Sequence, residues 1–258
     1  MSLDGQPEHF SKLASEYRRV RTTDIDPIAF IKQATKDYRE IKAADIGCGA
    51  GRYDLLLFKY LNNLDLTCVD ANKSMLEQVS HYLREHGISN FHTLKADANS
   101  FSLEPASLNC VFTFNAIHHF NFTRFLASAS AALEPNGRIF IYTRTRSQNA
   151  RNIWGRFFPK FSETETRLFE LEEMKDWVTA CTSVELETVQ EFKHKRQAAL
   201  QELVDKVKAG HYSTFALYDE DTLAKSIQVF QENIRTAFPD TDRVVWEDEN
   251  IMLILRRS

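Results

Sequence analysis

The stretch that decides the fold is residues 43–51, with the sequence AADIGCGAG. Its first residues are apolar and predict a short strand. Gly47, Gly49 and Gly51 stand at every second position of the loop that follows. Glycine has no Cβ and tolerates positive φ, so the backbone of such a loop can approach a ligand closely. The segment from Arg52 onward predicts a helix whose free N–H groups would point toward that ligand.

The next strand indicates what the ligand contains. Residues 64–69 are mostly apolar and are followed by Asp70. An acid at the end of the second strand of a βαβ unit is well placed to accept hydrogen bonds from both hydroxyls of a ribose. A dinucleotide fingerprint would need a third glycine where Arg52 stands, and the Gly-Lys-Ser/Thr ending of a phosphate-binding Walker loop is absent. The pattern therefore predicts an adenosine-containing ligand of another kind.

Asp45, the three alternating glycines and Asp70 together resemble motifs I and II of the class I S-adenosylmethionine-dependent methyltransferases. The wider similarity is to methyltransferase type 11 and the ubiquinone and menaquinone biosynthesis enzymes, and it spans about residues 10–143. It implies S-adenosylmethionine as cofactor and S-adenosylhomocysteine as product. No metal is expected, because the sequence shows no ligand set with metal-binding spacing.

Further segments extend the resemblance to a set of cofactor contacts. Residues 95–98 are similar to the motif whose acid binds the adenine amino group, although Asp97 also begins a good turn sequence. Tyr17 and Arg21 resemble a helical lid, and the alternative is an amphipathic helix with a snorkelling arginine. The implied cofactor-binding residues are Tyr17, Arg21, Asp45, Gly47, Cys48, Gly49, Gly51, Asp70, Ala71, Asp97, Ala98 and Asn115.

The catalytic residues are not determined by the pattern. Asn115 ends the fourth predicted strand, where the cleft of an open α/β sheet lies. His118 and His119 follow, and histidine titrates near pH ~6.5, so either is a candidate general base, as is Tyr17. The alternative is that one histidine packs and the other caps the next turn. Methyl transfer from a sulfonium does not require an acid or base unless the acceptor must lose a proton.

Candidate acceptor contacts follow the fifth predicted strand. Residues 144–161 mix arginine with aromatic residues. Arginine binds carboxylate and phosphate through two parallel hydrogen bonds, which favours an acceptor with an anionic group. The alternatives are a solvated basic face and an aromatic core. The residues proposed for the acceptor are His119, Arg144, Arg146 and Trp154.

The predicted fold class is α/β, a Rossmann-like, seven-stranded and mostly parallel sheet. Helices cover both faces, the last strand is antiparallel, and extra helices form a lid. Residues 1–40 are expected to form a helical lid, residues 41–145 the cofactor-binding core, and residues 146–258 the acceptor side that completes the same domain. The later elements are predicted as a helix over 162–180, a strand over 183–192, helices over 196–209 and 220–237, and a strand over 251–256.

Composition narrows the class of protein. The 258 residues carry a net charge of −4, which gives no reason to expect nucleic-acid binding. No apolar run approaches the ~20 residues of a membrane span, and the polar N-terminus does not read as a signal peptide. The four cysteines form no close pair, which favours buried free thiols and a cytoplasmic location.

The sequence therefore predicts a methyltransferase that uses S-adenosylmethionine and acts on a small-molecule acceptor. An RNA methyltransferase, a non-catalytic S-adenosylmethionine-binding protein and a nicotinamide-dependent oxidoreductase remain alternatives. The acceptor and the oligomeric state do not follow from the sequence.

Overall fold

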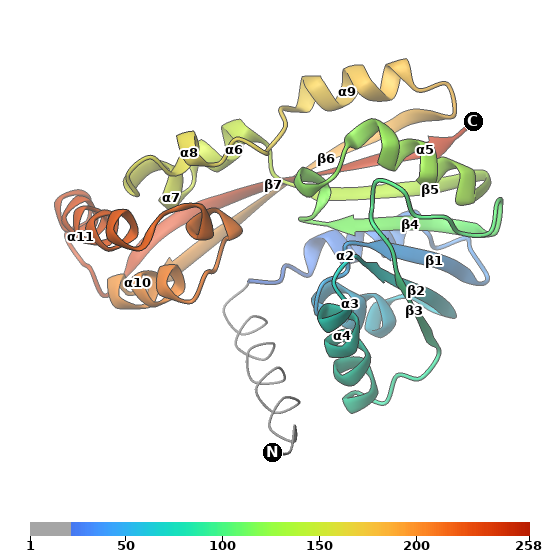
Figure 1. Cartoon of the computed structure of the whole chain (residues 1–258), viewed down its shortest axis with the longest axis horizontal. Helices are drawn as coiled ribbons and strands as arrows, with labels where there is room; N and C mark the ends of the chain where they lie inside the picture. Colours follow the sequence, from blue (N-terminus) through green and yellow to red (C-terminus); the bar gives the residue numbers. More distant parts are fainter. Residues whose placement is uncertain (1–21) are drawn as a thin grey trace, which may run out of the picture.

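The computed structural model describes residues 22–258, so Tyr17, Arg21 and most of the lid expected over residues 1–40 lie outside the described part. Within that range, the described residues form one helix, Asp26–Ala34. The described chain forms a seven-stranded sheet in the order β3-β2-β1-β4-β5-β7-β6 (Figure 1). The first five of these strands are parallel, and β7 runs antiparallel to both β5 and β6. This arrangement confirms the predicted α/β class, the mostly parallel sheet and the antiparallel last strand.

The strands alternate with helices through the first half of the chain. The strands are β1 (Ile41–Ile46), β2 (Leu64–Asp70), β3 (Phe91–Lys95), β4 (Leu108–Phe114), β5 (Leu133–Thr143), β6 (Val184–Ala198) and β7 (Val244–Arg257). The helices are α2 (Asp26–Ala34), α3 (Arg52–Tyr60), α4 (Lys73–Glu85), η1 (Ile117–His119), α5 (Phe122–Ala132), α6 (Arg146–Arg151), α7 (Ile153–Phe157), α8 (Phe161–Thr164), α9 (Leu171–Ala180), α10 (Leu200–Lys208), η2 (Ser213–Leu217) and α11 (Glu220–Ala237).

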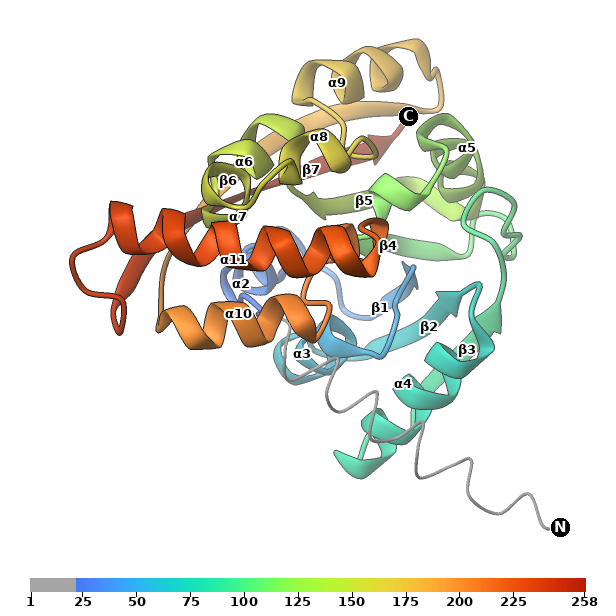
Figure 2. The same ribbon diagram turned by 60° about the vertical axis from the view of Figure 1, so that its left-hand side comes forward.

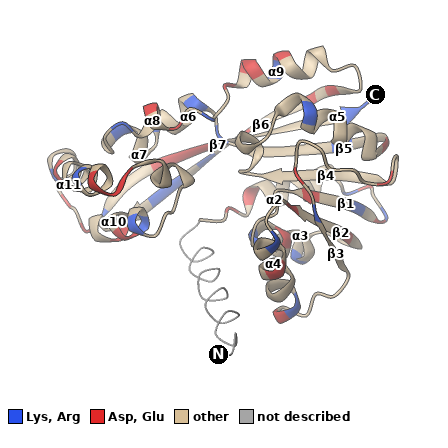
Figure 3. Cartoon of the chain, viewed as in Figure 1, with Lys and Arg blue, Asp and Glu red and all other residues tan. Residues whose placement is uncertain are grey.

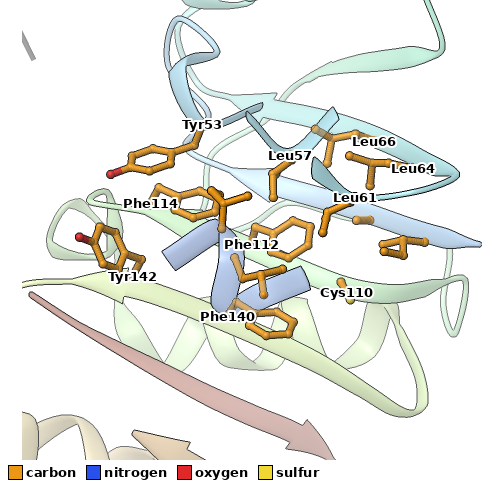
Figure 4. Close-up of a cluster of buried hydrophobic side chains, with 14 of the residues drawn as sticks. Tyr53, Leu57, Leu61, Leu64, Leu66, Cys110, Phe112, Phe114, Phe140 and Tyr142 are labelled. Carbon is orange, nitrogen blue, oxygen red and sulfur yellow. The ribbon is translucent and has the colours of Figure 1, made fainter. Parts of the chain in front are cut away.

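Each face of the sheet buries its own apolar cluster. On one face, α2, α3 and α4 pack against alternate residues of the strands, including Phe112 and Phe140 (Figure 4). On the other face, α5 and α9 cover residues such as Val111 and Ile139. Because the two faces are both covered, the central strands carry nearly continuous apolar sequence. The parallel strands are thereby held with their carboxyl ends along one edge, where the cleft described below lies.

The two last strands extend far beyond the rest of the sheet. The cross-strand pairs of β6 and β7 continue to Ala198 and Val244, well past the pairing of β5 with β7. These extensions carry α6 to α8 on one side, and α10 and α11 near their far end (Figure 1). Figure 2 shows α10 and α11 side by side along the extension. A third apolar cluster, centred on Trp154 and Phe230, lies between these elements.

Several elements after residue 143 differ from the prediction. The helix expected over 162–180 is divided into α8 and α9. Glu165, directly after α8, turns inward and accepts hydrogen bonds from Arg167 and Thr214. Both β6 and β7 are longer than predicted, and β6 continues through residues 196–198, which were expected to begin a helix. Of the helices in the described part, none combines the length and apolar character needed to cross a bilayer.

The third cluster yields a test of stability. Trp154 is 2% exposed, stacks on Phe230 with ring centroids 5.2 Å apart, and meets Phe215 edge-on. Trp154→Ala should lower the free energy of unfolding by about 3–5 kcal/mol, because truncating a buried aromatic leaves a cavity. Urea denaturation measures this. Val229→Ala, at an exposed position of α11, is the control and should change stability by less than about 0.5 kcal/mol. If Trp154→Ala changed the free energy of unfolding as little as Val229→Ala, a structural role for Trp154 would be contradicted.

Candidate active site at the carboxyl end of the sheet

A cleft of about 580 Å³ opens at the carboxyl ends of β1, β2, β3 and β4. Its size lies within the range of about 300–1,000 Å³ that is usual for sites binding small molecules. The following predicted residues line it: Asp45, Gly47, Cys48, Gly49, Asp70, Ala71, Asp97, Ala98, Asn115, His118 and His119. The fold therefore brings together residues that lie far apart in the sequence, from Asp45 to His119.

The loop after β1 is fastened to the end of β2. The amides of Gly47 and Cys48 both donate to the carbonyl of Val69, at 2.8 and 3.1 Å. The Gly49 amide donates to Oδ2 of Asp70 at 2.9 Å, and the Asn72 amide donates to Oδ1 of Asp70 at 2.8 Å. A carboxylate has about four acceptor positions, so each oxygen of Asp70 retains capacity for a further donor. The carboxylate is thus held in place at the cleft and is able to bind a ligand.

The three alternating glycines serve different purposes. All have positive φ, but a Cβ on Gly47 would lie 2.8 Å from the Cβ of Ala116, and one on Gly51 would overlap the side chain of Val79. At Gly49, a Cβ would meet nothing within 4 Å. All three glycines were predicted to allow close approach of a ligand. Gly47 and Gly49 line the cleft, and packing against Ala116 is a further reason for glycine at position 47. Gly51 is outside the lining, and its contact with Val79 explains the absence of a side chain there.

Two buried carboxyls lie beneath this loop. Asp45 is 1% exposed and Asp54, on α3, is fully buried. Asp54 accepts a hydrogen bond from the Cys68 thiol at 3.2 Å, whereas its Oδ2 and the Oδ1 of Asp45 have no partner. Burial, reinforced by the neighbouring acids, raises the pKa of Asp45 well above its usual range. Burial likewise raises the pKa of Asp54 to about 7. Asp45 is among the residues that line the cleft, but its unpartnered Oδ1 is shielded from solvent.

The loops after β3 and β4 form the other walls. Oδ1 of Asp97 accepts from the Asn99 amide at 2.7 Å, so this acid closes a turn while it also lines the cleft. Asn115 has a φ of +52°, which asparagine tolerates better than most residues. Its amide donates to the Tyr142 carbonyl at 2.7 Å, and its Oδ1 accepts from Asn250 at 3.4 Å. These bonds hold the Asn115 side chain between the cleft and a second pocket.

The second pocket is smaller, about 70 Å³, and adjoins the first. Both pockets are lined by Arg52, Tyr53, Asn115, His118 and Ser213. The remaining lining comes from the end of β5, from the extensions of β6 and β7, and from the segment between α10 and α11. A molecule in the second pocket would therefore lie next to a ligand in the first.

Most of the charges in the second pocket are paired within the protein. The Arg196 guanidinium donates to Asp24 and, at 3.2 Å, to Oδ2 of Asp248. Glu165 accepts from Arg167 and from the Thr214 hydroxyl. Burial alone would raise the pKa of Glu165, but these hydrogen bonds outweigh it and lower the pKa to about 2. Arg196 and Glu165 are therefore charged and fixed in position.

The four residues predicted to contact the acceptor do not lie together in the structure. Arg144 lines the second pocket, and His119 lines the larger cleft. Arg146 begins α6, pairs with Glu173 at 3.2 Å and lies outside both pockets. Trp154 is buried in the third cluster. In the described part of the chain, no group of three or more His, Cys, Asp or Glu side chains is arranged to hold a metal ion.

Some lining residues were missed by the sequence analysis. Arg52 and Tyr53 begin the helix after the glycine loop, so their position next to a ligand could have been inferred from helix geometry. Arg196 on β6 forms a diagonal ion pair with Asp248 on β7. Ser213 comes from a connection between helices. No local pattern marks these last three residues, because only the register of the long strands and the path of the insertion bring them to the site.

Comparison with known proteins agrees with this geometry. Residues 43–137 match the family described as "Methyltransferase domain". The chain is 27% identical over 134 residues to an uncharacterized methyltransferase, YcgJ of Bacillus subtilis, and this match spans about half of each protein, 51% of this chain and 52% of the relative. The crystal structure of YcgJ superimposes with a TM-score of 0.65, at 16% identity, over 90% of this chain and 98% of that one.

Two further solved structures show how widely the fold is used. Haemonchus contortus phosphoethanolamine N-methyltransferase 2, in complex with phosphomonomethylethanolamine and S-adenosylhomocysteine, gives a TM-score of 0.60 at 14% identity, over 98% of this chain and 58% of that one. The [4+2]-cyclase SpnF also gives a TM-score of 0.60, at 15% identity, over 89% of this chain and 78% of that one. Such low identities establish a shared fold and leave the reaction to be argued from the site.

The buried acid yields a pH-dependent prediction. Asp54 keeps its proton to about pH 7 in the folded state, whereas its ordinary pKa is 3.8. The folded protein then binds more protons than the unfolded chain between these pH values, so stability falls as the pH rises through them. Asp54→Asn stays neutral and should gain at least about 1 kcal/mol relative to the wild type over this range.

Urea denaturation at a series of pH values measures that difference. Asp37→Asn, which removes an exposed carboxyl, is the control and should follow the wild type at every pH. A constant difference between Asp54→Asn and the wild type would contradict a buried, protonated Asp54.

The glycine loop yields a second prediction. Gly51 has a φ of +82°, and the methyl group of an alanine there would overlap the Val79 side chain. Gly87 has a similar φ of +76°, but an alanine methyl group there would meet open space. Both should pay about 1–2 kcal/mol for the left-handed conformation. Gly51→Ala should lose roughly 1–3 kcal/mol more through overpacking. Chemical denaturation measures both, and Val79→Ala should recover part of the loss in a double-mutant cycle. Equal losses at the two glycines would refute the packing explanation.

Proposed function

The chain belongs to the class I S-adenosylmethionine-dependent methyltransferase family through the domain at residues 43–137, and on this premise we propose that it is an enzyme that methylates a small-molecule acceptor. The observation that carries the proposal is the Asp70 carboxylate at the end of β2. It is fixed by the Gly49 and Asn72 amides and retains acceptor capacity in a cleft large enough for a nucleoside.

The cleft offers partners for each part of this cofactor. Asp70 is proposed to accept from the ribose hydroxyls. The Asp97 carboxylate and the Ala98 amide, both at the cleft, are proposed to bind the adenine edge. The space beside Gly49 suits the methionine portion, and Asp45, which lines the cleft, is proposed to lie near its amino group with a water between them. Because these groups match the charge and polarity of S-adenosylmethionine, the residues present fit it.

The bound cofactor would supply a methyl group already activated by its sulfonium charge. The protein's contribution is then to align the acceptor atom and to exclude water. Tyr53 and Asn115, which line both pockets, are placed to orient an acceptor at the junction. His118 lies at the same junction and is a candidate base for an acceptor that must lose a proton. His119 lines the larger cleft but not the second pocket, and it is the weaker candidate for the base.

The charge distribution favours a small acceptor over RNA. Figure 3 shows basic and acidic residues interspersed along the elements visible in that view. The net charge is −4, and a nucleic-acid surface would instead gather basic residues on one face. The second pocket is also small, about 70 Å³. All four cysteines are free thiols, which is compatible with a cytoplasmic location as part of this proposal.

Asp70→Ala tests the cofactor site. The variant should bind S-adenosylhomocysteine roughly 100-fold more weakly, because two hydrogen bonds to a charged group are lost. Isothermal calorimetry measures the affinity, and thermal unfolding verifies that the variant is folded. Asp65→Ala is the matched control, since Asp65 lies on the same strand at its amino end, away from the cleft. Unchanged affinity in Asp70→Ala would remove the ribose assignment.

Activity is tested by incubating the protein with S-adenosylmethionine and a panel of small amines, alcohols, thiols and acids. Acceptor-dependent formation of S-adenosylhomocysteine, with a mass gain of one methylene on the acceptor, is the expected result. Tight cofactor binding without turnover of any member would instead favour a binding protein. Turnover of RNA alone would overturn the small-molecule assignment.

A further inference from the structure

Arg144 stands apart from the other charged residues of the second pocket. It directly follows β5, is half-buried, and its guanidinium lies 4.8 Å from the ring centroid of Tyr212. Its Nη1 nitrogen is shielded from solvent and has no hydrogen-bond partner. A buried donor that carries charge and lacks a partner is costly, and such a group is compensated when a ligand supplies the missing acceptor.

The neighbouring carboxylates do not fill this role. Among residues 22–258, Arg144 forms no ion pair, because Asp248 is engaged by Arg196 and by the Trp246 indole. Glu165 is engaged by Arg167 and Thr214. Asp24, the third acid of the pocket, is engaged by Arg196. Each acid therefore has an ion pair with a residue other than Arg144. Asp248 attracts the charge of Arg144, but no acceptor in the described part of the protein bonds its Nη1 nitrogen.

We propose that Arg144 binds a carboxylate group of the methyl acceptor, an inference that rests on the function proposed above. A guanidinium donates two parallel hydrogen bonds that match the two oxygens of a carboxylate. A cavity of about 70 Å³ accommodates a small group of this kind. The acids Glu165 and Asp248 in the same wall would repel a dianionic phosphate monoester more strongly than a singly charged carboxylate.

The geometry also sets the direction of the acceptor. Arg144 lies in the second pocket and outside the larger cleft. The passage between the two pockets is formed by Tyr53, Asn115 and His118, together with Arg52 and Ser213. With its carboxylate on Arg144, the acceptor would extend its nucleophilic atom through this passage toward the cofactor. The anchor thereby selects small molecules that carry a carboxylate at one end and an N, O or S nucleophile at the other.

The experiment uses the full chain saturated with S-adenosylhomocysteine. Acetate, propionate and benzoate are compared with acetamide, propionamide and benzamide, and inorganic phosphate is added as a further probe. Binding is followed by ligand-observed NMR and by the thermal shift. At least one carboxylate should bind, its amide should bind roughly tenfold more weakly or not at all, and phosphate should bind more weakly than that carboxylate.

Three variants assign the effect to Arg144. Arg144→Gln should weaken binding of the carboxylate by roughly tenfold or more. Arg144→Lys keeps the charge without the two-pronged geometry and should weaken it by a smaller factor. Arg146→Gln is the matched control, because Arg146 is two residues away, exposed, and outside both pockets, and it should bind as the wild type does. Should Arg144→Gln fail to fold, Arg144→Lys decides the question.

Affinity for S-adenosylhomocysteine is measured in every variant and should not change. If the wild type does not bind S-adenosylhomocysteine at all, the proposed function is wrong. If it binds S-adenosylhomocysteine but fails the carboxylate tests below, only the role of Arg144 is wrong. The carboxylate assignment is overturned when no carboxylate binds, when amides or phosphate bind as well as acids, or when both Arg144 variants bind as the wild type does.

Discussion

The position of β1 between β2 and β4 is the constraint on which the site depends. The chain leaves β1 toward β2 on one side and later returns to place β4 on the other, so the loops after β1 and β4 diverge and leave a cleft between them. The hydrogen bond from the Gly49 amide to Asp70 fixes one wall of that cleft. The left-handed Asn115 at the end of β4 fixes the other. The larger cleft follows from this divergence, whereas the second pocket also needs the extensions of β6 and β7.

The parallel half of the fold could be predicted because its signals are local. β2 agrees with the apolar run expected at residues 64–69 before Asp70, and β4 ends directly before Asn115, where the fourth strand was expected to end. The end of a strand also locates its last side chain at the cleft. For this reason Asp70, Asp97 and Asn115 could be assigned to one site before their positions in space were known. Their contacts with a cofactor stay predictions.

The acceptor half could not be predicted, because its signals depend on pairing between distant segments. Residues 244–250 are rich in acids and do not resemble a strand. They pair with basic residues of β6, as Lys193 does with Glu247 and Arg196 does with Asp248. Such pairs are visible only when the register is known. The same limit explains why Trp154, whose neighbours come from α11 and η2, could not be distinguished from a pocket residue.

The two halves of the site are therefore held by different forces. Backbone hydrogen bonds at the end of a fully covered parallel sheet position the groups proposed for the cofactor, and few side chains can change there without disturbing the loop. Side-chain ion pairs on the β6 and β7 extensions form the wall proposed for the acceptor. Because the ion pairs with Arg196 hold Asp24 and Asp248 in place, substitutions elsewhere in that wall can alter the shape and charge of the pocket while the cofactor side stays intact. A fold with such a separation can carry different reactions, and the solved structures that share it include a cyclase and an N-methyltransferase.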